Sequence, residues 1–344
     1  MTGGRAATVT LAHGAGGGAM KALIEEVFLA AFAEGAPRER EDAAVTALAD
    51  LAVRGDRLAF TSDSYVVTPI VFPGGDIGRL AVCGTVNDLA TAGAVPLQLS
   101  CSVILVEGLA IDVLRDVARS MAAAAREAGV AIVTGDTKVV PHGACDRLFV
   151  NTAGIGVVRA GVELSVTHCR PGDAVLVTGT LGDHGAAVLA ARGDLDLETS
   201  LTSDVAPLNG LVAALLDAVP DTRFLRDATR GGLATVLNEA AEASGVGITV
   251  NETAMPVRDA VRGVCEILGL DPLYLANEGK MVAVVPGDRA EAALAALRAH
   301  PLGAEAARIG TCVAERPGQV VMDTAFGGRR IVDVLTGEQL PRIC

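Results

Sequence analysis

The last residue of the chain is a cysteine, which places a thiol beside the chain's own terminal carboxylate. The sequence ends Pro341-Arg342-Ile343-Cys344. A solvated cysteine thiol has a pKa of about 8.5 and a neighbouring carboxylate disfavours the thiolate, so another group must activate this thiol. Arg342 is near enough in sequence to offset that charge, and Pro341 restricts the backbone. These residues predict a presented, reactive tail, whereas the simpler alternative is a chain that happens to end in cysteine.

Four aspartates form a second group, because each lies near the end of a predicted element or in a glycine-containing turn. They are Asp63, Asp88, Asp136 and Asp227. Magnesium prefers oxygen ligands and bridges one or two carboxylates to substrate phosphates, which allows an acidic site to bind a triphosphate. Each aspartate alone is more typical of a turn or a helix cap. Together with nearby glycines, Lys138 and Arg230, they favour a site for ATP and Mg²⁺.

The chain has three glycine-containing loops, of which the first and the third directly precede predicted helices. They are His13-Gly14-Ala15-Gly16-Gly17-Gly18, Gly182-Asp183-His184-Gly185 and Arg226-Asp227-Ala228-Thr229-Arg230-Gly231-Gly232. Glycine lets backbone N–H groups approach an anion closely, and the following helix N-terminus favours negative charge. The first loop matches neither the P-loop nor the dinucleotide fingerprint and is also typical of a linker. The third suits a phosphate with its metal, and a capped helix with solvated arginines is an equal alternative.

Strand and helix patterns mix throughout the chain without the regular alternation of a doubly wound sheet. The pattern predicts strands at 8–11, 58–61, 65–67, 97–106, 131–134, 147–156, 174–178, 281–285 and 308–313. It predicts helices at 20–33, 77–92, 111–128, 208–219, 232–244 and 290–299. Residues 62–64 are expected to leave a strand, and 135–138 to form a turn after one.

A break at Arg170-Pro171-Gly172-Asp173 divides the chain into halves of similar size. We therefore expect a mixed α/β protein with an N-terminal domain over 1–165, a C-terminal domain over 170–330 and a flexible tail over 331–344. Each half is long enough to bury a core of its own.

Composition excludes several classes of protein. Hydrophobic residues make up 51% of the 344, but no apolar run reaches the roughly 18 residues that span a bilayer, and no basic secretory start is present. The seven cysteines are scattered without a C-x-x-C pair, which argues against a disulfide framework or a zinc site. A net charge of −13 and 3% aromatic residues argue against nucleic-acid binding. We expect a cytoplasmic protein.

The motifs together resemble the HypE family of hydrogenase maturation factors, within the superfamily of aminoimidazole ribonucleotide synthetase and selenophosphate synthetase. The resemblance covers nearly the whole chain, and the terminal Pro-Arg-Ile-Cys is its most specific part. The other matching segments are the His13 loop and residues 72–78, 84–90, 136–140, 152–156, 182–185, 226–232 and 277–279.

The resemblance implies a two-domain fold, a homodimer formed by the N-terminal domains, and ATP in a cleft beside that domain. It implies that the carbamoyltransferase HypF loads a carbamoyl group onto Cys344, which ATP-dependent dehydration then converts to thiocyanate. The cyanide would pass to iron on the HypC–HypD complex and become a ligand of the [NiFe]-hydrogenase centre.

This chemistry gives each candidate residue an expected role. Glu278 is the expected base, with a structural salt bridge to Lys280 as the alternative. Lys138 is expected to stabilise the phosphoryl group or the carbamoyl oxygen, while His13 and His184 either orient their loops or touch substrate. The expected metal ligands are Asp63, Asp88, Asp136 and Asp227, and the expected nucleotide-binding residues are Gly14, Gly16, Gly17, Asp63, Asp88, Asp136, Asp183 and Arg230.

Two other functions compete with this one. A selenophosphate synthetase would carry a reactive cysteine near its N-terminus, but the first cysteine here is Cys83, and a small-molecule kinase has no use for a terminal thiol. A scaffold that only presents Cys344 would leave the aspartates and glycine loops without a purpose. Nucleotide-binding calorimetry separates a scaffold from an enzyme.

Overall fold

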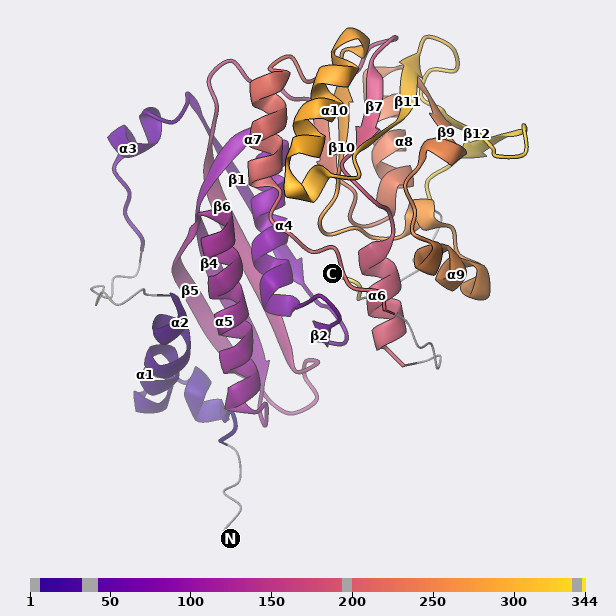
Figure 1. The fold of residues 1–344 in the computed structure, drawn as a ribbon. Coiled ribbons are helices and arrows are strands. Elements are labelled where there is room, and N and C mark those ends of the chain that lie inside the picture. The colour runs from indigo at the N-terminus through magenta and orange to yellow at the C-terminus, as the bar shows by residue number, and fades with distance from the viewer. Residues whose placement is uncertain (1–6, 33–42, 194–199, 336–341) are drawn as a thin grey trace.

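The computed structural model describes residues 7–32, 43–193, 200–335 and 342–344. Two α/β units lie side by side, the first built on a four-stranded sheet and the second on a seven-stranded sheet (Figure 1). The C-terminus lies between the two units, near α4 (Ile77–Thr91) and α6 (Asp183–Ala191). The predicted mixed α/β class is confirmed.

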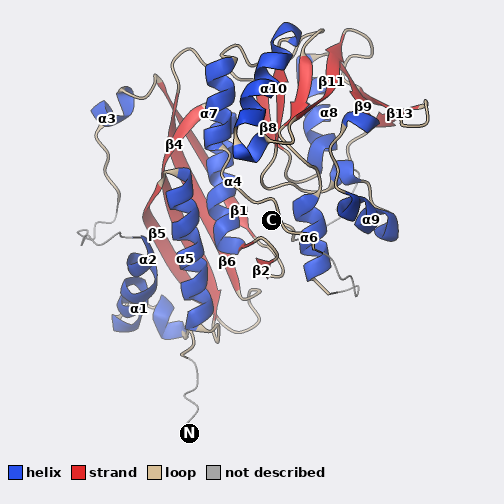
Figure 2. Ribbon diagram, in the orientation of Figure 1, coloured by secondary structure: helices blue, strands red, loops and turns tan. Residues whose placement is uncertain are grey.

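The N-terminal sheet has the order β1-β6-β4-β5, in which only β4 and β5 are parallel. Its strands are β1 (Arg57–Tyr65), β4 (Ala94–Val106), β5 (Ala131–Val140) and β6 (Leu148–Val158). Helices α4 and α5 (Ile111–Ala128) cover one face (Figure 2). Strands β1 and β5 therefore form opposite edges of this sheet.

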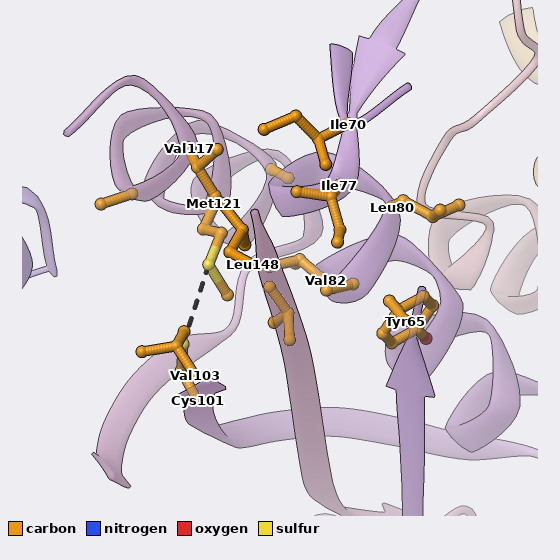
Figure 3. Close-up of a cluster of buried hydrophobic side chains, with 14 of the residues drawn as sticks. Tyr65, Ile70, Ile77, Leu80, Val82, Cys101, Val103, Val117, Met121 and Leu148 are labelled. Atoms are coloured by element: carbon orange, nitrogen blue, oxygen red, sulfur yellow. Dashed lines mark hydrogen bonds between the residues drawn. The ribbon is translucent and has the colours of Figure 1, made fainter. Parts of the chain in front are cut away.

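Apolar residues from α4, α5 and the inner face of the sheet form the core of this unit (Figure 3). The Cys101 thiol of β4 lies 3.8 Å from the Met121 sulfur of α5 within it. The side chain of Asp76 caps α4 by accepting the Arg79 backbone N–H at 2.8 Å, as the sequence predicts. Helix α5 ends at Gly129, whose positive φ of 72° suits a residue without a side chain.

Short elements precede and interrupt this sheet. They are η1 (Leu11–Gly14), α1 (Gly18–Leu23), the π-helix η2 (Ile24–Leu29), α2 (Ala30–Phe32), α3 (Leu48–Ala52), β2 (Val71–Phe72) and β3 (Gly75–Asp76). The predicted strand at 8–11 is wrong: Thr8 makes an isolated bridge to Ala110, and the chain then turns into η1.

The C-terminal sheet has the order β13-β12-β9-β11-β7-β10-β8. Its strands are β7 (Ala174–Val177), β8 (Phe224–Asp227), β9 (Gly247–Asn251), β10 (Met281–Val285), β11 (Ala307–Val313), β12 (Val320–Asp323) and β13 (Arg329–Val332). With α6, its helices are α7 (Asn209–Ala218), α8 (Gly232–Ser244), α9 (Asp259–Leu268) and α10 (Ala290–Ala299), and its 3-10 turns are η3 (Glu252–Ala254), η4 (Pro272–Tyr274), η5 (Gly287–Arg289) and η6 (Pro301–Gly303).

Two strands continue where the sequence predicts interruptions. β1 runs through Ser62–Ser64, because β6 pairs with it along its whole length. β5 runs through Gly135, where a side chain would collide with the Cys101 backbone oxygen at 2.0 Å, so this glycine permits close strand packing rather than a turn. β13 ends at Val332, two residues inside the predicted tail.

No helix in the described ranges is both long enough and apolar enough to cross a membrane.

Candidate active site

A cleft of about 660 Å³ lies between the two units. Its walls come from β1 and α4 on one side and from β8, α8 and the loop between them on the other. The polar and charged side chains that line it are Thr61, Ser62, Asp63, Asp88, Thr91, Ser165, Arg226, Asp227, Thr229, Arg230, Thr235 and Glu239. Three of the four predicted metal ligands therefore share one cavity with Arg230.

Three carboxylates concentrate negative charge in this cleft. The Thr61 hydroxyl donates to Asp88 at 2.8 Å, and the Arg230 guanidinium lies 3.8 Å from Asp63. Burial raises the pKa of Asp227 to about 7, and the charge of Asp88 contributes. Burial also raises the pKa of Asp88, with a smaller contribution from Asp63. The cleft is thus a site in which a cation would relieve repulsion between carboxylates.

The local sequence explains how these residues meet. Asp63 alternates with outward-facing residues along β1, and Asp88 sits near the C-terminal end of α4. Asp227 ends β8, and Gly231 and Gly232 turn the chain into α8 with φ of 74° and 59°. A side chain at Gly232 would lie 2.6 Å from the Leu273 and Leu275 oxygens.

The carboxylates of the cleft could bind magnesium only together with ligands from water and phosphate. Within the described ranges, no three carboxylate, thiol or imidazole side chains lie close enough to hold a metal by themselves. Magnesium does not require this, because it usually binds through one or two carboxylates plus waters and phosphate oxygens. Asp63, Asp88 and Asp227 fit that requirement, since burial raises the pKa of Asp227 and the charge of Asp88, which a cation would offset, adds to the rise.

The end of the chain is docked against the protein rather than presented to solvent. The Val66 N–H donates to an oxygen of the terminal carboxylate at 3.2 Å, and the Thr68 N–H donates to the Arg342 carbonyl at 3.3 Å. Arg192 of the α6 C-cap donates to the same carbonyl at 2.9 Å. Ile343 is 5% exposed. The expectation of a presented tail is therefore wrong for this arrangement, because main-chain contacts hold the last three residues.

His184 is one of the residues that hold the docked tail. Its Nε2 lies 2.8 Å from the Ile343 carbonyl and must donate to it, which makes Nδ1 the acceptor of the Ser203 hydroxyl at 2.8 Å. Burial lowers the pKa of His184, so the neutral ring is favoured. The sequence predicts that His184 either orients its loop or touches substrate. In the structure it contacts the main chain of the tail. We name Val66, Thr68, His184 and Arg192 the tail contacts.

The Cys344 thiol lies in an acidic environment. Burial raises its pKa, and the charges of Glu278, Asp63 and Asp227 raise it further, while Arg230 lowers it. The predicted offset by Arg342 is not what the structure shows, because that guanidinium pairs with Asp146. Arg230 is the cation that opposes the rise.

Glu278 is the residue whose charge raises the pKa of this thiol most. It is 3% exposed, and its Oε1 has no hydrogen-bond partner among the described residues. Burial raises its pKa well above the usual value, and the charges of Asp227, Asp204 and Asp63 add to the rise. Lys280 pairs with Asp204 at 3.3 Å, so the alternative role of Glu278 as the salt-bridge partner of Lys280 is not supported.

Two buried asparagines position the Glu278 segment. Asn87 of α4 donates to the Glu278 carbonyl at 3.3 Å and to the Ala206 carbonyl at 3.1 Å. Asn277 accepts the Gly182 N–H at 2.7 Å and donates to the Ala228 carbonyl at 2.9 Å. The segment before β10 is therefore attached to both units, which fixes the backbone of Glu278.

The remaining predicted residues lie at the other edge of the N-terminal sheet. Lys138 and Asp136 of β5 pair at 2.9 Å with both side chains more than half exposed, and this hydrogen bond lowers the pKa of Asp136. Gly14 packs on the same strand, since a side chain there would lie 2.8 Å from the Val139 nitrogen. Gly16 and Gly17 have open space around them. Within one chain, the predicted ATP site is therefore divided between two sheet edges.

His13 and Asp183 make local contacts. The Thr10 N–H donates to His13 Nδ1 at 2.9 Å, so His13 orients its own loop. Asp183 is buried at the start of α6, accepts from the Thr180 hydroxyl and lies 3.7 Å from Arg258. It does not line the 660 Å³ cleft.

Sequence reasoning missed Asp204 and Arg192. Asp204 occupies a segment without regular secondary structure, next to Glu278 in space and 74 residues away in sequence. Its only signal is a charged residue directly before the apolar run Val205-Ala206-Pro207-Leu208. Arg192 follows α6, where a C-terminal arginine normally interacts with the helix itself.

Comparison with known proteins finds a family match for each of the two units. The description "AIR synthase related protein, N-terminal domain" matches residues 40–158, and "AIR synthase related protein, C-terminal domain" matches 170–323. The carbamoyl dehydratase HypE of Rhodobacter capsulatus is 59% identical over 336 residues, covering 98% of this chain and 98% of that protein.

Solved structures are similar over nearly the whole chain. The hydrogenase maturation protein HypE in complex with ATP has a TM-score of 0.92 at 52% identity, covering 98% of this chain and 100% of that one. A HypE–HypF complex has a TM-score of 0.79 at 48% identity, covering 91% and 100%. This chain therefore belongs to the carbamoyl dehydratase HypE family, a family of hydrogenase-maturation enzymes within the AIR synthase related proteins.

Proposed function

We propose that this protein uses ATP to dehydrate a carbamoyl group on Cys344 to thiocyanate, which supplies cyanide to the iron of [NiFe]-hydrogenase. The observation that carries the proposal is the docked position of the tail, held at the Cys344 and Ile343 oxygens, in which the charges of Glu278, Asp63 and Asp227 act on the thiol. Mass spectrometry of the C-terminal peptide, after incubation with the carbamoyltransferase HypF and ATP, tests it by detecting carbamoyl and then thiocyanate on Cys344.

The reaction needs a phosphoryl acceptor and a base. The carbamoyl oxygen attacks the γ-phosphorus of ATP, the bond to ADP breaks, and the nitrogen loses one proton. The C–O bond then breaks, phosphate leaves with its electron pair, and the second N–H proton goes to a base as the C≡N bond forms. The products are the S-cyano group, ADP and phosphate, with two protons released from nitrogen. Activation by phosphate is required because an amide oxygen is a poor leaving group.

Glu278 is the proposed base. A raised pKa makes a carboxylate a stronger proton acceptor, and a catalytic base works best when its pKa is close to the working pH. Its Oε1 has no competing hydrogen bond among the described residues. The neighbouring tail contacts would hold the carbamoyl group in place, which replaces diffusion of a free substrate.

The cleft carboxylates are the proposed site for ATP and Mg²⁺. Asp63, Asp88 and Asp227 would share the cation with phosphate oxygens, and Arg230 would contact the phosphates. A bound Mg²⁺ would offset the charge that develops during phosphoryl transfer. The solved HypE structure in complex with ATP supports nucleotide binding by this chain.

Asp88→Asn and Asp227→Asn should each weaken Mg²⁺-dependent ATP binding sharply while the protein stays folded. Each change removes an anionic ligand, so the phosphate charge is less compensated. Isothermal titration calorimetry with and without Mg²⁺ measures the effect. Asp217→Asn, an exposed carboxylate paired with Arg159 at 2.7 Å, is the matched control. Unchanged affinity in both cleft variants would remove these residues from the site.

Loading of Cys344 requires a different position of the tail. In the docked position burial raises the pKa of the thiol, which disfavours the nucleophilic thiolate. HypF would therefore act on an undocked tail, and docking would follow loading. The solved HypE–HypF complex supports HypF as the partner. Transfer of cyanide to iron on HypC–HypD would use the same release of the tail.

A homodimer is the proposed way to join the two divided parts of the site. The sheet face opposite α4 and α5 exposes Leu58, Phe60 and Ile104, and Phe60 is 72% exposed. An apolar face of this kind is typical of an interface. A two-fold pairing through it would bring the β5 edge of one subunit, with Lys138 and Asp136, beside the β1 edge of its partner.

Mixing two inactive variants should restore activity if the site is shared. Lys138→Ala and Asp88→Asn subunits, co-refolded in equal amounts, should regain about a quarter of wild-type dehydration, since half of the dimers are mixed and each has one intact site. Each variant alone should be nearly inactive. Activity that stays at the level of the separate variants after confirmed subunit exchange would show that Lys138 acts within its own chain or not at all.

A further inference from the structure

The structure holds Glu278 through one carboxylate that lies outside the cleft. Asp204, with a side chain 4% exposed, belongs to the segment between α6 and α7. Its Oδ1 accepts the Glu278 backbone N–H at 3.1 Å. Its Oδ2 lies 3.3 Å from the Lys280 ammonium nitrogen. The two oxygens of Asp204 thus engage the residues on either side of Gly279.

Gly279 completes this arrangement. A side chain there would lie 1.8 Å from the Asp204 carbonyl oxygen, so only glycine permits the two segments to approach this closely. Its φ lies outside the positive range, so contact with Asp204 is the constraint rather than backbone conformation. Glu278, Gly279 and Lys280 therefore contact Asp204 at three successive positions.

The same short segment also contacts the tail. Ser203, next to Asp204, hydrogen-bonds to His184, and His184 donates to the Ile343 carbonyl. Asn87 bonds to both the Ala206 and the Glu278 carbonyls. Residues 203–206 therefore connect the support of Cys344 with the support of Glu278.

We propose that Asp204 is a positioning residue for dehydration, which holds the backbone of Glu278 at a fixed place relative to the docked Cys344. This inference rests on the proposed function, in which Glu278 removes a proton from the carbamoyl nitrogen. Asp204 does not touch the substrate. It acts through the Glu278 N–H and through Lys280, whose stem packs on Gly179. A misplacement of a catalytic group by about 1 Å costs on the order of 10²-fold in rate.

The test compares variants that remove different parts of this support. Asp204→Ala removes both contacts and should slow dehydration of pre-carbamoylated protein roughly 10²-fold. Asp204→Asn keeps an acceptor for the Glu278 N–H and loses only the ion pair, so it should retain a rate within about tenfold of wild type. Gly279→Ala leaves Asp204 intact but forces the segments apart, and it should resemble Asp204→Ala.

Two further measurements distinguish a positioning role of Asp204 from a general loss of structure in its variants. HypF-dependent loading and ATP affinity should stay within about twofold in all three variants, because neither step uses Glu278. Hydrogen exchange of the peptide that contains Glu278 should accelerate in Asp204→Ala and stay slow in Asp204→Asn. Asp173→Asn is the control, since Asp173 is also buried, accepts the Arg170 N–H at 2.7 Å and lies 3.6 Å from Arg223.

The outcomes distinguish this inference from the proposed function. Normal dehydration in Asp204→Ala and Gly279→Ala, or losses of loading and ATP affinity equal to the loss of dehydration, would overturn the positioning role. Equal rates for the Ala and Asn variants would also overturn it, because the Glu278 N–H contact would then be irrelevant. Absence of thiocyanate in the wild type would instead overturn the proposed function, and hydrogen exchange would still report whether Asp204 holds the Glu278 backbone.

Discussion

Replacing Glu278 with glutamine leaves ATP binding and carbamoyl loading intact and slows dehydration by a factor of roughly 10² to 10⁴, the usual loss when a general base is removed. The carbamoyl form of Cys344 then accumulates, because glutamine has nearly the same shape but no basic oxygen. Mass spectrometry of the C-terminal peptide over time measures both species. Glu127→Gln is the control, since Glu127 is an exposed partner of Arg79 at 2.7 Å.

The pH dependence of dehydration provides an independent signature of the same residue. A base acts in its deprotonated form, so the rate rises as the pH increases through its pKa. Burial and three neighbouring carboxylates raise the pKa of Glu278, so this rise falls at higher pH than for an ordinary glutamate. Glu278→Gln should lose the rise. A profile that survives unchanged in this variant, or thiocyanate formation at the normal rate, would make Glu278 structural.

Changes at the chain end should abolish thiocyanate formation completely. Cys344→Ala removes the carrier atom, and Cys344→Ser replaces the thiol with a poorer nucleophile that is also a poorer donor of cyanide. A few residues added after Cys344 should also block the reaction, because Val66 contacts the terminal carboxylate and Ile343 is buried against the core. Arg342→Gln is the control, since the Arg342 side chain is half-exposed and pairs with the equally exposed Asp146.

Shortening the tail should fail because the tether can no longer reach its contacts. A deletion must begin after β13, because Val332 is buried in the C-terminal sheet. Residues 336–341 lie outside the described part of the chain. A short tether gives effective concentrations in the millimolar range, which a deletion would remove. Normal thiocyanate formation in both the lengthened and the shortened proteins would show that tail length is irrelevant.

The sequence predicts regular elements well where one local signal dominates. The bounds of α5 and α10 agree with the predicted helices, and β10 begins and ends where expected, because amphipathic spacing and a short apolar run leave few alternatives. The strands that contain Asp63 and Asp136 are harder to predict, since the neighbouring serine and glycine residues indicate turns locally. Pairing with β6 and β4 overrides those local signals.

The candidate site was only partly predictable for a related reason. Asp63, Asp88 and Asp227 share the cleft as expected, but Asp136 and Lys138 lie at the opposite sheet edge, and strand order is not readable from local patterns. Docking of the tail depends on main-chain contacts with residues more than a hundred positions away, such as His184 and Arg192. The role of Asp204 could not be predicted from the sequence for the same reason, since its partner Glu278 is distant in sequence.

Val66, Thr68, His184 and Arg192 hold the docked tail through its main chain, while the Ile343 side chain is buried in the core. These four residues bond to oxygens of the last three residues, and none of these bonds involves a side chain of the tail. Such recognition resembles that of an extended peptide bound at a sheet edge, in which main-chain hydrogen bonds supply affinity and a buried side chain, here Ile343, supplies specificity. The tail is then an intramolecular ligand, and a free peptide ending in Ile-Cys would compete with it only at concentrations above the effective concentration that the tether provides.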